Sequence, residues 1–168
     1  MSTPAFFFDR DGTINASPGP GYVLRWEDFH FLPGVSPMLA AVKSHGWKTI
    51  LVTSQQGVGK GLMSAESLAE IHHRMQAALG PAAAFDGIYA CTGLDGADPR
   101  RKPSPAMILE AARDHHLDLA SSWNIGDKDR DLAMGRAAGV PHNLLLGSPE
   151  FPDWPAVLRH WRAAAAPR

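Results

Sequence analysis

The chain has 168 residues, of which 45% are hydrophobic and 20% charged, and its formal net charge is -1. This length suits one domain over residues 1–168, and the near-neutral charge without a basic run argues against nucleic acid as a partner. No apolar stretch approaches the roughly 20 residues that span a bilayer, and a signal peptide is not recognisable, so we expect no membrane partner. The single cysteine, Cys91, fits a reducing compartment. We therefore expect a cytoplasmic protein, and we take it to act as a monomer.

Predicted strands and helices alternate along the chain. Runs of apolar and β-branched residues predict strands at 5–9, 49–53, 85–91, 122–125 and 142–146. Capping residues and apolar stripes predict helices at 36–46, 64–79, 104–116, 129–139 and 154–164. Proline and glycine predict a loop at 15–22, glycines 57, 59 and 61 predict a second loop, and 26–31 is expected to hold a brief extended piece.

This alternation predicts a parallel sheet covered by helices on both faces, which is a three-layer α/β/α, Rossmann-like fold. In such sheets, ligands bind outside the carboxyl ends of the strands. The residues that follow each predicted strand are therefore the candidates for a functional site.

The first predicted strand ends at two carboxylates. Side chains alternate along an extended backbone, so Asp9 and Asp11 start on the same side, and Gly12 then lets the chain turn away. Two carboxylates at the end of a buried strand repel each other and are costly to desolvate. A divalent cation relieves that cost, and oxygen ligands suit magnesium. Taken by itself, the same stretch also fits an exposed acidic turn.

Polar residues follow the other predicted strands as well. Thr53 and Ser54 end the second strand, Arg101 and Lys102 precede a helix, and Asp127 follows the fourth strand. Phosphoryl transfer needs such a set, because a carboxylate can attack phosphorus and form an aspartyl phosphate. A metal and a lysine neutralise the phosphoryl oxygens, which hydroxyls and backbone N–H groups also hold.

Four blocks of the chain resemble the signature blocks of the haloacid dehalogenase superfamily. They are Asp-Arg-Asp-Gly-Thr at 9–13, Val-Thr-Ser-Gln at 52–55, Arg-Lys-Pro-Ser-Pro at 101–105 and Gly-Asp-Lys at 126–128. Within it, the chain is similar to the bacterial heptose bisphosphate phosphatases and the histidinol-phosphate phosphatases. The intervals between blocks are filled by one helix and its loops each, which leaves no room for a cap domain. The resemblance implies a magnesium-dependent hydrolase of a small phosphorylated metabolite.

The resemblance also implies roles for the acidic residues and the lysine. Asp9 would be the nucleophile and a magnesium ligand. Asp11 would be the general acid and base, and would give magnesium its backbone carbonyl. Lys102 would bind both the transferring phosphoryl group and Asp9, and Asp127 would complete the metal site. Asp131 is expected to orient either a metal-bound water or Lys128.

Further roles concern the substrate. By the same resemblance, Thr53 and the backbone N–H of Ser54 would bind the transferring phosphoryl group, Arg101 would reach the substrate, and Gln55 belongs to the same substrate-binding block. Lys60 lies between glycines, so it is either a solvated loop lysine or a ligand for a distal phosphate.

Two departures from the family pattern concern the loops at this edge. The family commonly has a cysteine-and-histidine zinc loop, whereas residues 92–100 contain no histidine and only Cys91 stands beside them. Four soft ligands cannot be assembled there, so we expect no structural zinc. In addition, Ser54 stands where the family usually has asparagine.

The adjacent pairs His72-His73 and His115-His116 are each predicted to lie on a helix. Neighbouring helical side chains point about 100° apart, so neither pair chelates a metal easily. A solvated helix face is the favoured interpretation.

Three functions remain open. Cations border the predicted site and no free acidic cluster would receive an amino group, which favours a sugar bisphosphate over histidinol phosphate. A receiver domain that only accepts a phosphoryl group is the alternative from another class. It would need its acceptor aspartate at the end of an inner strand, where Thr53 stands. Release of inorganic phosphate separates a hydrolase from a receiver.

Overall fold

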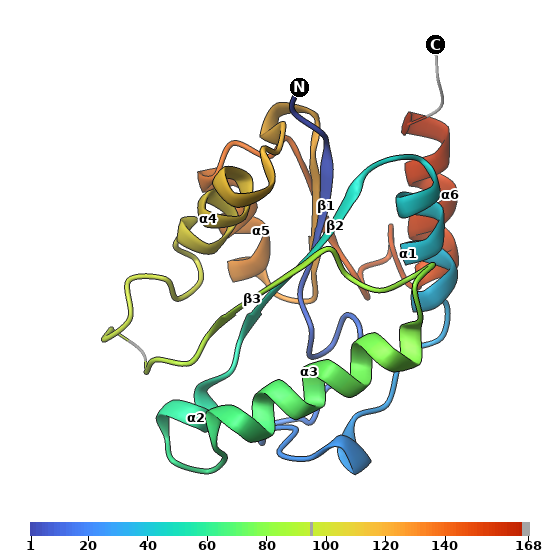
Figure 1. Cartoon of the computed structure of the whole chain (residues 1–168). Helices are drawn as coiled ribbons and strands as arrows, with labels where there is room; N and C mark the ends of the chain where they lie inside the picture. Colours follow the sequence, from blue (N-terminus) through green and yellow to red (C-terminus); the bar gives the residue numbers. More distant parts are fainter. Residues whose placement is uncertain (95, 166–168) are drawn as a thin grey trace.

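The fold is described by a computed structural model that covers residues 1–94 and 96–165 (Figure 1). Within these residues, parallel strands form a five-stranded sheet in the order β3-β2-β1-β4-β5. The strands are β1 Ala5–Phe8, β2 Lys48–Ser54, β3 Gly87–Cys91, β4 Trp123–Gly126 and β5 His142–Leu145. Phe8 pairs with Leu51 on one side and with Ile125 on the other, so β1 is the central strand. The predicted parallel α/β sheet is confirmed.

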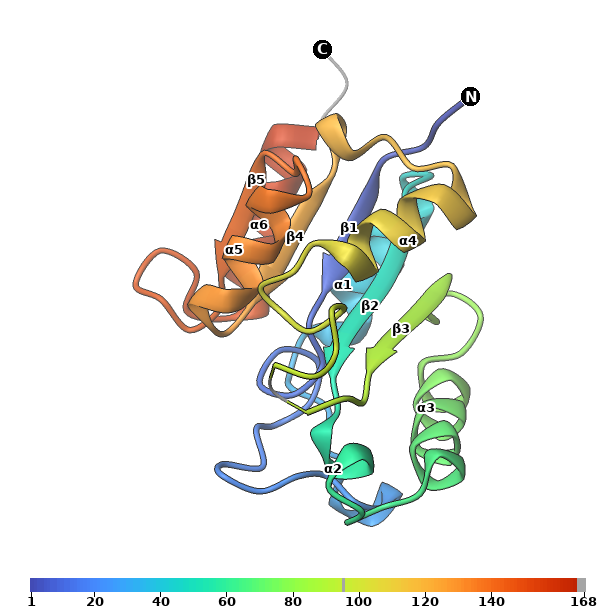
Figure 2. The same ribbon diagram turned by 90° about the vertical axis from the view of Figure 1, so that its left-hand side faces the viewer.

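Helices cover both faces of this sheet. They are α1 Val35–Ser44, α2 Gln56–Gly59, α3 Ala65–Leu79, α4 Ala106–His115, α5 Asp129–Ala137 and α6 Trp154–Ala165, with 3-10 turns η1 Trp26–Asp28 and η2 Leu119–Ser121. Helices α1, α3 and α6 pack on one face and α4 and α5 on the other (Figures 1 and 2). The described intervals between strands hold only helices and loops, without a cap domain. Within the same residues, no helix combines the length and apolarity that crossing a membrane requires.

Strand β1 divides the core into two layers. Phe6 and Phe8 are fully buried among side chains of α1, α3 and α6, whereas Ala5 and Phe7 pack with residues of α4 and α5. A strand buried on both faces must be apolar at every position, which explains the run of three phenylalanines. Each fully buried aromatic side chain contributes roughly 1.5–3 kcal/mol, so this strand firmly fixes the position of the residues that follow it.

The segment expected to be extended at 26–31 differs from its prediction. Trp26–Asp28 forms the 3-10 turn η1, and only Phe31 makes an isolated bridge, to Asn15. Trp26 stacks on Phe29 with ring centroids 5.1 Å apart, which favours a turn that brings the two rings together. The short helix α2 within the predicted glycine loop was also not expected, because two of its four residues are glycine.

Helix starts were predicted within a few residues. Helix α1 begins at Val35 after Gly34, whose φ of 89° is in the left-handed region, rather than at a cap formed by Ser36. Helix α4 begins at Ala106, and Ser104 accepts a hydrogen bond from the Ala106 N–H at 3.3 Å. The prediction for α3 is accurate, because Ser64 accepts from the Ser67 N–H as an N-cap.

Candidate active site

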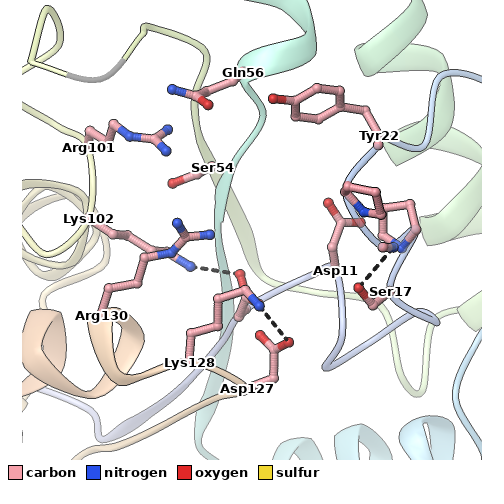
Figure 3. A pocket seen from close by; sticks show the side chains of 15 residues that line it. Asp11, Ser17, Tyr22, Ser54, Gln56, Arg101, Lys102, Asp127, Lys128 and Arg130 are labelled. Carbon is pink, nitrogen blue, oxygen red and sulfur yellow. Dashed lines mark hydrogen bonds and ion pairs between the residues drawn. The ribbon is translucent and has the colours of Figure 1, made fainter.

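A cavity of about 220 Å³ lies at the carboxyl ends of β1, β2 and β4 (Figure 3). Besides Asp9 and Asp11, it is lined by the loop at 17–22 and by Ser54, Gln56, Arg101, Lys102, Asp127, Lys128 and Arg130. Figure 3 shows Asp11 and Tyr22 on one side of this cavity and Arg101 and Lys102 on the other. The structure therefore brings most of the predicted site residues to one place.

Lys102 connects two carboxylates at the bottom of the site. Its Nζ donates to Asp9 Oδ1 and to Asp131 Oδ1, both at 2.7 Å, and its side chain is 2% exposed. Burial alone would lower the pKa of Lys102, but the charges of Asp9 and Asp131 outweigh it and raise the pKa. The lysine is thus held as an ammonium beside the carboxylate expected to be the nucleophile.

The three carboxylates around Lys102 carry more negative charge than one lysine balances. Burial raises the pKa of Asp9 to about 7; Lys102 opposes this shift, whereas the charges of Asp131 and Asp127 add to it. Each of these three aspartates has an oxygen within 4.8 Å of the others. Asp127 Oδ1 is also buried and lacks a hydrogen-bond partner among the described residues. A hard divalent cation fits this oxygen-rich site, and magnesium is the cation of choice.

Gly12 allows the close approach that this cluster needs. Its φ is 84°, and a Cβ at this position would overlap the Asp127 carboxylate. Asp131 is placed by the start of α5, where its Oδ2 accepts from the Lys128 N–H at 3.2 Å. The carboxylate of Asp131 thus belongs to the cluster, whereas for Asp11 the resemblance implies only a backbone carbonyl at the metal.

The carboxylate of Asp11 is turned toward buried donors. Its Oδ1 accepts from Arg10 Nη2 at 3.0 Å and from Asn15 Nδ2 at 2.9 Å, and its Oδ2 accepts from Gln55 Nε2 at 3.0 Å. Its side chain is 23% exposed and lines the cavity. Asp11 can therefore meet a substrate while its orientation is fixed from behind.

Three residues of the second block, Thr53, Ser54 and Gln55, lie in different environments. Ser54 lines the cavity, and its Oγ is buried without a hydrogen-bond partner among the described residues, so it is available to a bound anion. Thr53 is buried and its Oγ1 accepts from Gln55 Nε2 at 2.8 Å. Gln55, expected near the substrate, is fully buried and does not line the cavity.

Basic side chains surround the mouth of the cavity. Arg101 lines it, as expected, and so do Lys128 and Arg130, for which no substrate role was predicted. Their position three or fewer residues after Asp127 is the signal that points to them. Lys60 is exposed outside the lining, and its ammonium lies 5.2 Å from the ring centre of Tyr22, which does line the cavity.

His72 corrects an expectation for the histidine pairs. Its neighbour His73 is exposed, but His72 is only 8% exposed and lies 3.1 Å from Arg10 Nη1. Burial, together with the charge of Arg10, lowers the pKa of His72 to about 4, so the imidazole is neutral. The prediction of a solvated face is wrong for this residue, because Ile71, His72 and Met75 lie on the buried side of α3.

Comparisons with known proteins agree on one group. Residues 99–148 match the HAD-hydrolase-like family model. The chain is 39% identical over 145 residues to the D-glycero-beta-D-manno-heptose-1,7-bisphosphate 7-phosphatase of Helicobacter pylori, covering 84% of this chain and 83% of that protein. It is 38% identical over 155 residues to the D-glycero-alpha-D-manno-heptose-1,7-bisphosphate 7-phosphatase of Burkholderia mallei, covering 87% and 81%.

A solved structure extends the likeness to the whole fold. The D,D-heptose 1,7-bisphosphate phosphatase from B. bronchiseptica, complexed with magnesium and phosphate, superimposes with a TM-score of 0.86 at 28% identity. The match covers 96% of this chain and 99% of that one. Magnesium in that relative agrees with the cation that the carboxylates of this chain favour.

Proposed function

The chain belongs to the heptose bisphosphate phosphatase family of the haloacid dehalogenase superfamily, and we propose that it releases the 7-phosphate of a D-glycero-D-manno-heptose 1,7-bisphosphate. It is a magnesium-dependent phosphatase. The observation that carries the proposed chemistry is the 2.7 Å contact between Lys102 Nζ and Asp9 Oδ1 beside the cavity. This contact places a buried ammonium at the carboxylate that attacks phosphorus.

In the first half-reaction, an oxygen of Asp9 attacks the phosphorus of the substrate. The phosphorus–oxygen bond to the sugar breaks, and the sugar oxygen takes a proton from the carboxyl group of Asp11. Lys102, Ser54 and Thr53 are the chain's own candidates for holding the phosphoryl oxygens. The products of this step are the sugar monophosphate and an aspartyl phosphate on Asp9.

In the second half-reaction, water releases the phosphate. Asp11, now a carboxylate, takes a proton from a water molecule whose oxygen attacks phosphorus. The bond to Asp9 breaks, and inorganic phosphate leaves. No cap domain among residues 1–94 and 96–165 excludes water, so water is the final acceptor, and this distinguishes a hydrolase from a mutase.

The candidate metal site consists of the carboxylates clustered at the bottom of the cavity. Asp9 and Asp127 would hold magnesium, together with the backbone carbonyl of Asp11, and Asp131 lies close enough to orient a ligand or join them. When bound, the cation neutralises charge on the phosphoryl group. It also offsets the excess negative charge of the aspartate cluster.

The substrate preference follows from the basic mouth of the cavity. The mouth is lined by Arg101, Lys128 and Arg130. A substrate with two phosphates offers them the anionic oxygens of its second, non-reacting phosphate. Histidinol phosphate would instead place a cationic amino group near these basic side chains, which would repel it. Comparing kcat/KM for the two substrates tests this point, and we expect the heptose bisphosphate to be better.

We also propose that residues 1–168 act as one catalytic domain, as a monomer in the cytoplasm. The support is that one sheet and one chain supply every group of the proposed site. The free cysteine, Cys91, suits a reducing compartment. The mass of the active species in solution tests the monomer.

Removing divalent metal should abolish phosphate release. Without magnesium, the carboxylates near Asp9 repel one another and the incoming phosphate, so activity with a chelator should fall to background and return on adding magnesium. The measurement is release of inorganic phosphate from heptose bisphosphate.

We expect protein purified without added zinc to contain no zinc, and a tightly bound stoichiometric zinc would refute the prediction made from the loop that follows Cys91.

Arg101→Ala should reduce kcat/KM for the heptose bisphosphate by roughly 10- to 100-fold, the effect of losing a charge-assisted hydrogen bond. Arg101 lines the cavity beside Lys102, so its guanidinium can reach an oxygen near the reacting phosphate. Arg159→Ala is the matched control, because Arg159 is an exposed arginine of α6 outside the cavity lining. Equal kcat/KM for the two variants would show that Arg101 does not bind the substrate.

A further inference from the structure

A buried polar network lies directly behind Asp11. Arg10, Gln55 and Asn15 are fully buried, and His72 is 8% exposed. Arg10 and Asn15 lie in the loop that follows β1, Gln55 follows β2, and His72 lies on α3, so three separate segments converge on one carboxylate. None of these four residues lines the cavity, whereas Asp11 does.

The two oxygens of Asp11 differ in the number of donors they accept. Oδ1 accepts from Arg10 Nε at 3.1 Å, Arg10 Nη2 at 3.0 Å and Asn15 Nδ2 at 2.9 Å. Oδ2 accepts only from Gln55 Nε2 at 3.0 Å among the described residues. An oxygen with three donors has no room for a proton, so the proton of the acid must be carried by Oδ2.

Gln55 is itself fixed in one orientation. Its Oε1 accepts from Arg10 Nη2 at 3.1 Å, and its Nε2 donates to Thr53 Oγ1 at 2.8 Å as well as to Asp11. Turning the amide over would place its nitrogen against an arginine donor. The network therefore specifies both the rotamer of Gln55 and the oxygen that it contacts on Asp11.

Arg10 is fixed at its other end by His72. Arg10 has no acceptor lone pair, so at the 3.1 Å contact Nη1 donates and His72 Nε2 accepts, which places the imidazole proton on Nδ1. The ring of Phe29 lies under the guanidinium, with its centre 5.8 Å from the carbon of that group. The neutral state of His72, which burial favours, is the state that this contact requires.

We propose that His72, acting through Arg10, and Gln55, in direct contact with Asp11, are positioning residues that hold Asp11 with Oδ2 toward the leaving group. This inference rests on the proposed role of Asp11 as the acid and base. In the first half-reaction the proton passes from Oδ2 to the sugar oxygen, and in the second it passes from water to Oδ2. Oδ1 keeps the same donors in both states, so the carboxyl group need not rotate between them.

A substrate pair separates this role from a general loss of structure. The sugar oxygen of a heptose bisphosphate is a poor leaving group and needs a proton, whereas p-nitrophenyl phosphate loses a stable phenolate and needs little help from an acid. The ratio kcat/KM reports the first half-reaction, in which Asp11 donates. Misplacing Asp11 should therefore lower kcat/KM for the sugar substrate and change the aryl substrate little.

The variants are His72→Leu, which removes the acceptor, and His72→Gln, whose side-chain oxygen can replace it. For His72→Leu we expect kcat/KM for the heptose bisphosphate to fall roughly 10- to 100-fold, the cost of a displaced catalytic group. His72→Gln should recover most of that loss. His73→Leu is the matched control, because His73 is the exposed neighbour on the same helix.

Equal losses on both substrates in folded His72→Leu, or no loss on either, would overturn the proposal, and so would a failure of His72→Gln to recover activity. Thermal unfolding monitors the fold. If His72→Leu does not fold, Gln55→Met decides, since it removes the Oδ2 contact and should give the same substrate-selective loss. Wild-type protein inactive on both substrates would instead refute the proposed phosphatase function.

Discussion

Asp9→Asn should abolish turnover while the protein stays folded. An amide oxygen cannot attack phosphorus as a carboxylate does, and loss of a nucleophile typically costs about 10⁴-fold or more in kcat. The amide still offers Lys102 an acceptor at the position of the 2.7 Å contact. Burial raises the pKa of Asp9 to about 7, so replacing this carboxylate with a neutral group also removes an electrostatic cost.

The measurement is phosphate release together with trapping of the phosphorylated protein. Wild-type protein quenched in acid during turnover should carry phosphate that hydroxylamine removes, and Asp9→Asn should carry none. Asp129→Asn is the control, because Asp129 is an exposed aspartate at the start of α5. Even a few per cent of wild-type activity in Asp9→Asn, with deamidation excluded by mass spectrometry, would end the assignment of Asp9 as nucleophile.

Local sequence patterns predicted the sheet and its functional edge well. The three phenylalanines before Asp9 predicted a buried strand, and the alternation of strands with helices predicted a parallel sheet, in which the structure places β1 at the centre. Because parallel strands end at the same edge, Asp9, Thr53 and Asp127 were expected to lie near one another. This argument needs only the strand boundaries, which the apolar runs make clear.

Contacts between distant segments were beyond that reasoning. Lys102 and Asp9 are 93 residues apart, and only the resemblance to a family paired them. Arg10 and His72 are 62 residues apart, so their contact could not be predicted, although His72 lies between Leu68 and Met75 on the apolar stripe that marks the buried face of α3. Gln55 was expected near the substrate because it follows Ser54, whereas its fully buried side chain makes hydrogen bonds with Arg10, Asp11 and Thr53.

The same limitation applies to the cavity mouth. Lys128 and Arg130 line the cavity although no substrate role was predicted for them, and only their position shortly after Asp127 could have indicated it. Charge near a motif was still a useful guide, since Arg101 lines the cavity as expected. Asp131 shows the intermediate case: its place in the first turn of α5 was visible in the sequence, but its 2.7 Å contact with Lys102 was not.

Asp11→Asn should slow both half-reactions, by roughly 10²- to 10⁴-fold, because an amide can neither donate the proton to the sugar oxygen nor take one from water. The structure adds a second effect. The asparagine of this variant can present its oxygen to Arg10 and Asn15, but its amide nitrogen then faces the Gln55 nitrogen, where two donors meet. We therefore expect a modest loss of thermal stability besides the loss of rate.

Separate measurements of the two half-reactions and of metal binding test this prediction. Single-turnover phosphorylation of Asp9 reports the acid role of Asp11, and decay of the phosphorylated protein reports its role as base. Magnesium affinity should be retained in Asp11→Asn, because the expected metal contact is the backbone carbonyl, which the substitution keeps. The rate on p-nitrophenyl phosphate should fall less than the rate on heptose bisphosphate, since a phenolate leaves without a proton. If magnesium affinity is lost and the rate of phosphoryl transfer is kept, Asp11 is a metal ligand through its side chain and another group is the acid.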